Sequence, residues 1–495
     1  MIPWYASEKV RALDGRLIEA GTPGLELMER VARRIAAFAV NHAPFPSALI
    51  LAGAGNNGGD GLAAARILLR NGWKVNVLLS HGIERSRGDA AVNLQRFRSQ
   101  GGVCSESSRL DDGQIAALVH ESAVVIDALL GTGAAGAPRG ETARLIELVN
   151  AQRGGRGVLA VDLPSGAEGD GLCMNAQWTC TAAARKLPVA TGRRAALAGE
   201  LHLVPLDPRA DGFLSESDAD EPEARDIQSL LPIRRADDHK GTRGGVLIAA
   251  GSEQYRGAAL LAARGALRMG AGLVVLAAPS SVIDGATVAL PEIIGERVDT
   301  DSKFEKIMLK WKDRCKTLLV GSGLGRDERA KKICRAAESW EGPSLWDGDG
   351  LYWMARDGLE PAQRCLTPHE GEAARLLGVE KLHDRFAAAQ ALAERCGTSV
   401  LKGFRSLVAE KGKKTLIISK GDRTLSVPGS GDVLAGAAAA LLASGISARS
   451  ALAAAAWIHG AAGERLGRMK GQDGVLAHEV ADSLPFVLKE LNARC

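Results

Sequence analysis

Several features that indicate particular classes of protein are scarce in this sequence of 495 residues. Aromatic residues make up only 4%, and 62 Lys and Arg residues nearly balance 58 Asp and Glu residues. Proteins that bind nucleic acids usually carry basic patches and stacking aromatics, so we expect no nucleic-acid partner. The eight cysteines form no CxxC pair and no short metal-binding spacing, which indicates reduced thiols in a cytoplasmic protein.

Segments that would direct the chain to a membrane are also missing. Residues 1–14 lack a basic start followed by an apolar run, so we expect no signal peptide. The longest apolar stretch, 433–463, is rich in Ala and Gly and is interrupted by Arg449, which favours buried helices over a membrane span. We therefore expect no membrane partner. Glycine, in contrast, is abundant, with 59 residues, which indicates many turns and loops that approach a ligand closely.

The chain shows two regions in which strands and helices alternate. In the first region, strands are expected at 48–52, 74–79, 124–127 and 158–162. In the second region, they are expected at 245–250, 273–277, 317–320 and 399–401. This alternation predicts an α/β fold with helices on both faces of each sheet, and functional residues at the carboxyl ends of the strands. Residues 207–223 contain seven acidic residues and little periodicity, so we predict domains at 1–210 and 225–495 joined by an acidic linker at 211–224.

The loop after the first predicted strand reads GAGNNGGDG, at residues 53–61. It contains the GxGxxG pattern, but the next strand ends in Ser80 where a dinucleotide-binding unit places an acidic residue. No Lys-Ser or Lys-Thr pair follows, so the loop is not a Walker loop either. Backbone N–H groups at the start of a helix suit an anionic ligand, and a tight strand–helix turn is the simpler alternative.

Two further loops in the first half follow strands that end in aspartate, DALLGTG at 127–133 and DLPSG at 162–166. Each loop alone is typical of a structural turn, but three such loops in one domain favour a site. Oxygen atoms of Asn57, Asp127 and Ser165 could share a hard cation. Asp162 is the candidate acid or base.

In the second half, PGSGD at 428–432 precedes a predicted helix, where glycine N–H groups would receive a phosphoryl group. Asp432 is then either a base for a substrate hydroxyl or the N-cap of the helix. TPHE at 367–370 predicts a helix start, with Thr367 as the cap and Glu370 closing a capping box. His369 has no role in that scheme and is a candidate for facing a ligand.

Three other segments of the second half have weaker signals. The loops at 321–325 and 402–406 follow strands and are typical of nucleotide-binding loops. Asp347 and Asp349 either bind magnesium through water or form an Asx turn.

The three motifs of the first half, in this order and spacing, resemble the NAD(P)H-hydrate epimerase domain over about residues 1–210, as do Leu13-Asp14 and Leu27-Met28-Glu29 near the start. The resemblance implies a Rossmann-like three-layer domain with Asp162 as the proton-transfer group and a potassium ion held by Asn57, Asp127 and Ser165. It also implies a set of residues that bind the hydrated nucleotide, namely Asn56, Asn57, Gly58, Gly59, Asp60, Gly131, Thr132, Gly133, Ala134, Ala135, Gly136, Ala137 and Asp162. Ala134 departs from the family, which often has Leu there.

Residues 225–495 resemble the ADP- or ATP-dependent NAD(P)H-hydrate dehydratase, a ribokinase-like α/β domain. The resemblance is carried by HKGTRG at 239–244, the 251–274 segment, GSGLG, TPHEGEAARLLG, LKG and GSGDVLAG. It implies that Ala258, Gly323, His369 and Asp432 bind the hydrate, with Asp432 as the base. It implies an ADP site formed by Lys402, Gly403, Phe404, Arg405, Ser406 and Gly431, with Mg²⁺ accompanying the nucleotide. Pro428 departs from the family, which commonly has Gly there.

We therefore predict a bifunctional enzyme of metabolite repair. Its first domain would interconvert the R and S hydrates of NADH and NADPH, and its second would dehydrate the S hydrate at the expense of ADP, giving AMP and phosphate. The expected partners are these small molecules and further copies of the chain in a homo-oligomer. Two alternatives are a vitamin-precursor kinase of ribokinase fold and a nucleotide-binding module without catalysis.

Overall fold

The computed structural model describes residues 1–134, 136–169, 171–214, 216–299, 303–361 and 363–493. The chain forms two compact units. Residues 3–219 make up the first unit, and residues 1–2 together with 220–495 make up the second.

The first unit is built on a fully parallel sheet. Its strand order is β4 (Val103–Glu106), β3 (Lys74–Leu79), β2 (Ser47–Ala52), β5 (Val124–Ala128), β6 (Gly157–Val161), β7 (Trp178–Ala182) and β9 (Glu200–Val204). The strand of this sheet that comes first in the sequence, β2, lies inside the sheet, and the connections reverse direction between β2 and β5. This is the doubly wound order of Rossmann-like folds, in which ligands bind beyond the carboxyl ends of the strands at the reversal.

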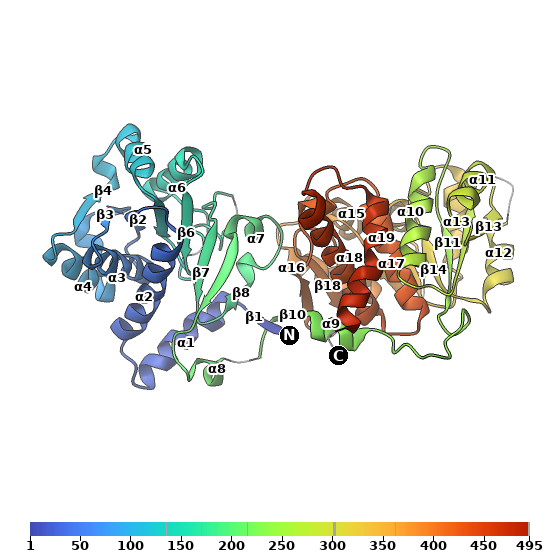
Figure 1. The fold of residues 1–495 in the computed structure, drawn as a ribbon, viewed down its shortest axis with the longest axis horizontal. Helices are drawn as coiled ribbons and strands as arrows, with labels where there is room; N and C mark the ends of the chain where they lie inside the picture. Colours follow the sequence, from blue (N-terminus) through green and yellow to red (C-terminus); the bar gives the residue numbers. More distant parts are fainter. Residues whose placement is uncertain (135, 170, 215, 300–302, 362, 494–495) are drawn as a thin grey trace. The chain divides into compact units, whose positions relative to one another are not determined.

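Helices cover both faces of this sheet, which gives the three layers that we predict (Figure 1). Apolar residues of α2 (Gly24–His42), α3 (Asn56–Arg70) and α4 (Gly88–Ser99) form a core with one face. Residues of α5 (Asp112–Glu121) and α6 (Gly140–Gln152) form a core with the other face. The remaining elements of the unit are α1 (Ser7–Glu19), α7 (Gly192–Ala198), α8 (Ala210–Phe213) and the short strand β8 (Arg185–Lys186), which pairs with Trp4 and Tyr5 of β1 (Ile2–Tyr5).

The second unit repeats the doubly wound order on a larger scale. Its strand order is β13 (Ile294–Arg297), β12 (Leu273–Ala278), β11 (Gly245–Ala249), β14 (Cys315–Val320), β15 (Ser344–Trp346), β16 (Arg364–Leu366), β17 (Thr398–Leu401), β18 (Ser406–Glu410) and β19 (Thr415–Ile418). The strands are parallel as far as β17, and β18 and β19 are antiparallel to their neighbours. The chain again reverses beside its first strand, between β11 and β14.

Small residues explain how the helices of the second unit pack. The helices are α9 (Ala224–Leu230), α10 (Arg256–Arg268), α11 (Ser280–Ala289), α12 (Phe304–Trp311), α13 (Glu328–Ala337), α14 (Asp349–Asp357), α15 (Glu370–Leu377), α16 (Arg385–Cys396), α17 (Ser430–Ala443), α18 (Ala448–Lys470) and α19 (Ala477–Asn492). Helices α10 and α17 lie in direct contact, because a Cβ atom on Gly436 would lie 1.9 Å from the carbonyl oxygen of Ala262. The Ala-rich stretch from 433 is therefore buried helix, as we predict (Figure 1).

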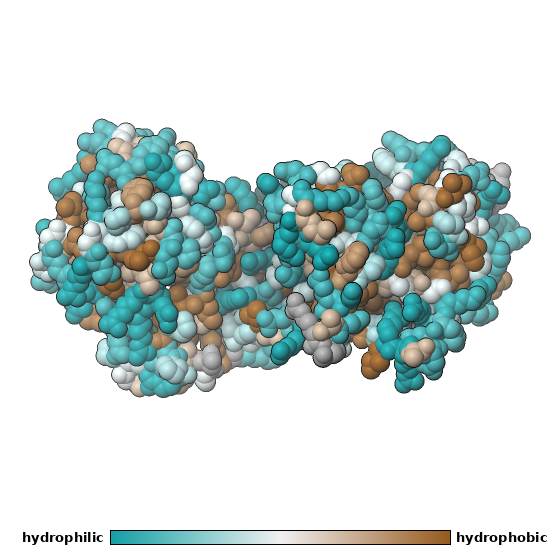
Figure 2. Space-filling view, viewed as in Figure 1, coloured by the Kyte–Doolittle hydropathy of each residue, from teal (hydrophilic) through white to brown (hydrophobic). Residues whose placement is uncertain are grey.

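The face of both units shown in Figure 2 is mostly hydrophilic, with apolar residues in smaller groups between polar ones. None of the helices in the described part of the chain is long and apolar enough to span a bilayer.

The predicted strands all form, with ends that differ by at most two residues. The acidic stretch 207–223 has more structure than its composition suggests, since it includes α8 and β10 (Ala219–Glu221). Two of its carboxylates have partners within the first unit. Asp207 binds Arg30 and Arg209, and Asp218 pairs with Lys9 at 2.7 Å.

Candidate active sites

A cavity of about 590 Å³ lies at the carboxyl ends of the strands in the first unit, and we call it the first cavity. Loops after β2, β3, β5 and β6 line it, together with α1 and α2. Most of the residues predicted to bind the hydrate line it, namely Asn56, Asn57, Asp60, Gly131, Thr132, Gly133, Ala134 and Asp162. Gly58 and Gly59 lie buried behind this surface, Gly136 borders a smaller adjoining hollow, and Ala137 lines neither space. Ala135 lies outside the described residues.

Gly58 is the position where the loop after β2 needs glycine most. A Cβ atom on Gly58 would lie 1.8 Å from the carbonyl oxygen of Gly53. The first turn of α3 therefore packs against the end of β2 more closely than any side chain allows. This contact sets the start of α3 at the cavity wall, where its N–H groups suit an anion.

Asp162 follows β6 and has a left-handed backbone, with φ of 69°. Its Oδ1 accepts hydrogen bonds from the Ala182 amide at 3.2 Å and pairs with Lys186 Nζ at 2.7 Å. Lys186 is only 1% exposed, and its ammonium also donates to the Ala182 carbonyl and the Thr181 hydroxyl. The carboxylate of Asp162 is therefore held in place by a buried cation.

Two more carboxyl groups, Asp14 and Asp60, line the same cavity. Partial removal from water at the cavity wall and the charge of Asp162 raise the pKa of Asp14, an otherwise exposed residue, to about 6. Burial, Asp162 and Asp14 raise the pKa of Asp60 well above its usual value. Asp14, Asp60 and Asp162 thus act on one another through their charges, and the ammonium group of Lys186 pairs with Asp162.

The residues predicted to hold potassium lie around the turn after β5. Asp127 is fully buried, and its carboxylate accepts the Ser165 amide at 2.8 Å and the Ser165 hydroxyl at 2.5 Å. The Ser165 Oγ also accepts the Leu130 amide. Asn57 lies against Gly131, the next residue along, and its amide nitrogen is buried without a hydrogen-bond partner. Burial raises the pKa of Asp127 to about 6.

This set of groups fits a hard cation. The hydrogen bonds of the buried Asp127 carboxylate come from neutral groups, and the carboxamide of Asn57 lies beside the same turn. Carboxylate, amide and hydroxyl oxygens are the ligands that such ions prefer.

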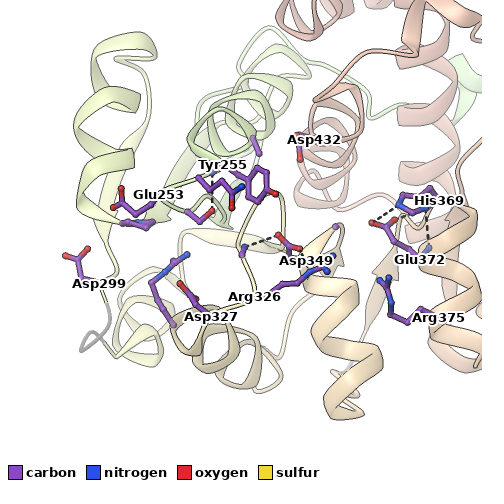
Figure 3. A pocket seen from close by; sticks show the side chains of 18 residues that line it. Glu253, Tyr255, Asp299, Arg326, Asp327, Asp349, His369, Glu372, Arg375 and Asp432 are labelled. Carbon is purple, nitrogen blue, oxygen red and sulfur yellow. Dashed lines mark hydrogen bonds and ion pairs between the residues drawn. The ribbon is translucent and has the colours of Figure 1, made fainter.

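A larger cavity of about 800 Å³ occupies the corresponding position in the second unit, and we call it the second cavity. All four residues predicted to bind the hydrate line it, namely Ala258, Gly323, His369 and Asp432. Figure 3 shows Asp432 entering from one helix, with His369, Glu372 and Arg375 together on another part of the wall. Gly323 and Ala258 meet closely, because a Cβ atom on Gly323 would lie 2.6 Å from the Cβ of Ala258.

Asp432 is the third residue of α17 and not its N-cap. The cap position belongs to Gly429, whose φ of 86° is left-handed, and no side chain caps this helix. The alternative that Asp432 serves as a helix cap is therefore wrong. Burial, followed by the nearby charge of Asp347, raises the pKa of Asp432 to about 7.

Lys402 lies beside Asp432 and links the loops after β15 and β17. Its Nζ is 2.7 Å from Asp347 Oδ1 and 3.9 Å from Glu372 Oε2. A Cβ atom on Gly431 would lie 3.5 Å from the same Nζ, so the ammonium also reaches the start of α17. The structure thus brings Lys402, Gly431 and Asp432 together.

The residues of the predicted ADP site all lie outside the lining of the second cavity, namely Lys402, Gly403, Phe404, Arg405, Ser406 and Gly431. Gly403 has a φ of 152°, and Arg385 lies over it, where a Cβ atom would be 2.7 Å from the guanidinium. Phe404 is 44% exposed and Arg405 stacks near its ring. An exposed aromatic ring beside a cation is typical of a surface on which a nucleotide base can stack.

The helix start predicted at TPHE lies two residues too early. His369, not Thr367, caps α15, and its Nδ1 accepts the Gly371 and Glu372 amides. The capping box is closed by Glu372, not by Glu370. The Thr367 hydroxyl instead donates to Asp347 at 2.8 Å. The predicted end of this helix at Gly378, in a left-handed conformation, is confirmed.

Asp347 and Asp349 do not form a ready magnesium cage. Asp347 Oδ1 is occupied by Lys402 and Thr367, and Asp349 accepts the Gly325 amide and Arg326. Among the described residues, no group of three or more His, Cys, Asp or Glu could hold a metal ion. Any magnesium in the second cavity would therefore depend on oxygen atoms of the nucleotide and water.

Several residues at these sites escaped the sequence analysis as functional groups. Lys186 stands in a short apolar stretch with no motif around it, and only the fold brings it to Asp162. Glu372 and Arg375 follow His369 at helical spacing, so they could have been placed on one face of the helix that His369 begins.

Comparisons with known proteins agree with a chain made of two different domains. A family model described as NAD(P)H-hydrate dehydratase matches residues 246–486, and one described as YjeF-related protein N-terminus matches residues 24–187. The chain is 36% identical to the bifunctional NAD(P)H-hydrate repair enzyme of Thermanaerovibrio acidaminovorans, covering 98% of both chains. It is 34% identical to the enzyme of that name from Escherichia coli, covering 98% of this chain and 93% of the relative.

Among solved structures, an ADP/ATP-dependent NAD(P)H-hydrate dehydratase from Bacillus subtilis, co-crystallised with ATP and Mg²⁺, matches with a TM-score of 0.50 and 28% identity. The match covers 55% of this chain and 99% of that one. A ribokinase-like superfamily protein from Enterococcus faecalis matches with a TM-score of 0.50 and 22% identity, covering 56% of this chain and 98% of that one. The ribokinase-like architecture predicted for the second half is confirmed.

Proposed function

This chain belongs to the family of bifunctional NAD(P)H-hydrate repair enzymes, and we propose that each of its two cavities carries out one of the two repair reactions. In the first cavity, the R and S hydrates of NADH and NADPH interconvert at ring carbon 6. In the second cavity, the hydroxyl of the S hydrate receives a phosphoryl group from ADP. Phosphate then leaves, which restores the dihydronicotinamide and releases AMP.

The second reaction follows from the position of Asp432. The carboxylate lies at the start of α17, where helix N–H groups and Lys402 stabilise the negative charge of a phosphoryl group in transfer. Asp432 takes the proton of the hydrate hydroxyl as that oxygen attacks the terminal phosphorus of ADP. Phosphorylation is useful because hydroxide is a poor leaving group and phosphate is a good one. Ala258, Gly323 and His369 bind the hydrate, and Lys402–Ser406 with Gly431 bind the nucleotide.

The first reaction uses the wall formed by α3 and the loop after β5. Asn56–Asp60 and the Gly131–Ala137 loop hold the anionic part of the nucleotide, and Asp162 moves a proton at the hydrated ring. The observation that supports two reactions is the presence of two separate cavities, each with a carboxylate beside a helix start.

A paired assay on the purified full-length chain tests the proposal. We expect conversion of the R hydrate to the S hydrate without nucleotide, and recovery of NADH from the S hydrate only when ADP or ATP is present. Phosphate release with each nucleotide shows which one is used. A chain that phosphorylates a vitamin alcohol and leaves the hydrates unchanged would be a kinase, and a chain that binds hydrates without converting them would be a binding module.

Potassium in the first cavity would be held by Asn57, Asp127 and Ser165, and would supply positive charge beside the anionic substrate. We expect Asp127→Asn, which keeps the shape and removes the charge, to lower epimerisation by about tenfold or more. Dehydration by the same protein should not change. Wild-type epimerisation is measured in potassium and in tetramethylammonium buffers of equal ionic strength. Equal rates in the two buffers would contradict a potassium site.

Dehydration should depend on pH through Asp432. A base must be ionised to accept a proton, and burial places the pKa of Asp432 at about 7. We therefore expect kcat/KM for the S hydrate to fall about tenfold per pH unit below that value and to level off above it. Initial rates between pH 5.5 and 8.5, with epimerisation followed in parallel, check this. A flat profile across this range would contradict Asp432 as the base.

Magnesium reaches the second cavity with the nucleotide phosphates, since the carboxylates found there already have partners. We also propose that the chain forms a homo-oligomer and that it is located in the cytoplasm. Light scattering on the purified chain checks the first, and fractionation of the cells that produce it checks the second.

We also propose that the two domains function independently, with the boundary between residues 210 and 225. Fragments 1–215 and 222–495 should fold and retain epimerase and dehydratase activity respectively. The second fragment loses the short strand β10, which lies beside β19, and the ion pair between the Met1 amino group and Asp226 at 2.8 Å. This ion pair is partly exposed and worth about 1 kcal/mol or less. Circular dichroism and the two assays test this. Aggregation of both fragments would contradict the boundary.

A further inference from the structure

The first cavity contains acidic groups to which its proposed chemistry gives no role, and Asp14 is one of them. Asp14, on α1, lines the cavity with Asp60 and Asp162, and the charge of Asp162 acts on both of the others. The cluster has one buried ammonium group, that of Lys186, and its ion pair is with Asp162 at 2.7 Å. The three carboxyl groups are therefore not equivalent.

Lys186 holds Asp162 through an ion pair. Its side chain is 1% exposed and is held by the Thr181 hydroxyl at 3.0 Å and by the carbonyls of Ala182 and Ala184 at 2.7 and 3.2 Å. An ammonium group fixed in this way also fixes the carboxylate that it pairs with. Removal from water and the charge of Asp162 raise the pKa of Asp14 and of Asp60, and the charge of Lys186 offsets only part of this at Asp14.

Building on the proposed epimerase function, we infer that Asp14 is a second proton-transfer residue of the first cavity and that Lys186 is a positioning residue that holds the Asp162 carboxylate in place. A pair of carboxyl groups, one protonated and one ionised, is the arrangement that acid and base chemistry at one carbon requires. Asp14 suits the acid because it faces the cavity and its pKa of about 6 lies near neutral pH. Asp60, with its pKa well above the usual value, suits a neutral hydrogen-bond donor to the substrate.

The reaction then balances without any further reagent. Asp14 gives its proton to the hydroxyl on ring carbon 6, the C–O bond breaks, and the lone pair of the ring nitrogen forms a C=N bond as water leaves. A water molecule adds to the opposite face of carbon 6, and its proton passes to Asp162. Exchange of protons with solvent restores the starting form of the two carboxyl groups. The reverse epimerisation follows the same path backwards.

The first experiment replaces Asp14 in the full-length chain. Asp14→Asn keeps the size of the side chain and removes its acid, so kcat for epimerisation should fall by about 10²–10⁴ while KM changes by no more than a few-fold. Asp14→Glu should restore part of kcat. Glu19→Gln, on the exposed end of the same helix, is the matched control and should behave as wild type. Dehydration of the S hydrate, measured on each protein, reports that the chain is folded.

The outcomes separate this inference from the function on which it rests. If wild type epimerises and Asp14→Asn retains its kcat within a few-fold, Asp14 is not a proton-transfer residue. If Asp14→Asn raises only KM, Asp14 binds substrate and the inference is again wrong. If the wild-type chain does not epimerise at all, the proposed function itself fails.

The second experiment tests Lys186 through the separate effects on kcat and KM. Lys186→Met leaves the Asp162 carboxylate without its partner at 2.7 Å, so kcat for epimerisation should fall by about tenfold or more while KM changes by no more than a few-fold. Lys186→Arg, which keeps a cation, should restore part of kcat. Thr181→Val, which removes only the hydroxyl that supports Lys186, should give a smaller loss of kcat and serves if Lys186→Met does not fold. An unchanged kcat in Lys186→Met, or no recovery in Lys186→Arg, would overturn the positioning role.

Discussion

Asp432→Asn is expected to lower the rate of S-hydrate dehydration by about 10²–10⁴, the usual loss when a general base is removed. The amide occupies the same space as the carboxylate and can still accept hydrogen bonds, but it takes no proton at neutral pH. Because Gly429 occupies the cap position of α17, the substitution removes no cap, and the melting temperature should stay within a few degrees of wild type. NADH recovered from the S hydrate with ADP is the measurement.

Epimerisation by the same Asp432→Asn protein is the internal control, since Asp432 lies in the second cavity and Asp162 in the first. Binding of ADP, followed by calorimetry, should be retained. Dehydration within a few-fold of wild type would mean that another group accepts the proton. An equal loss of both activities would contradict the division of the chain into two independent sites.

Lys402→Met should cause the largest loss of stability among the variants considered. The substitution leaves Asp347, whose side chain is 5% exposed, without its cation at 2.7 Å. Removing one partner of a buried ion pair typically costs about 3–5 kcal/mol. For a unit of this size, the melting temperature should fall by roughly 6–20 °C. Dehydration should also fall, because the lost ammonium no longer stabilises Asp432 in its ionised form. Thermal unfolding followed by circular dichroism measures the first effect.

Two further variants show whether the loss comes from the unpaired carboxylate. In Lys402→Met/Asp347→Asn, no buried charge is left unpaired, so much of the lost free energy of unfolding should return. Lys411→Met removes a lysine whose pair with Glu394 is more than half exposed on both sides, and it should have little effect. If the double variant is as unstable as Lys402→Met, the ion pair is not the source of the stability.

The sequence predicted the parts of the fold that depend on local pattern. The runs at 48–52 and 245–250 form central strands because parallel strands buried on both faces need continuous apolar residues. Strands such as β10 and β8, of three and two residues, are too short for any periodicity to reveal them. The start of α15 was misplaced by two residues because Thr and His can both accept N-cap hydrogen bonds, and only the tertiary contact of Thr367 with Asp347 decides between them.

The candidate sites could be predicted where a motif is contiguous and not where the fold assembles it. Asp162 and Asp432 stand in glycine-rich loops next to strands or helices, so their type and position indicate chemistry. Asp14 and Lys186 are separated by most of the first unit, and their approach to Asp162 depends on how α1 and β8 meet the sheet. Which charged side chains meet in a cluster is decided only when the chain folds, so no single segment of the sequence predicts it.

The left-handed backbone of Asp162 limits which amino acids evolution can place there. For most residues that conformation costs about 1–2 kcal/mol, whereas Gly, Asn and Asp adopt it readily. A library of all twenty residues at position 162, sorted first for folded protein, should therefore be enriched in these three. Sorted again for epimerisation, it should retain only Asp. Folding and catalysis thus restrict the residue at position 162 one after the other. In relatives that have lost the activity, we expect Asn or Gly to replace this Asp first.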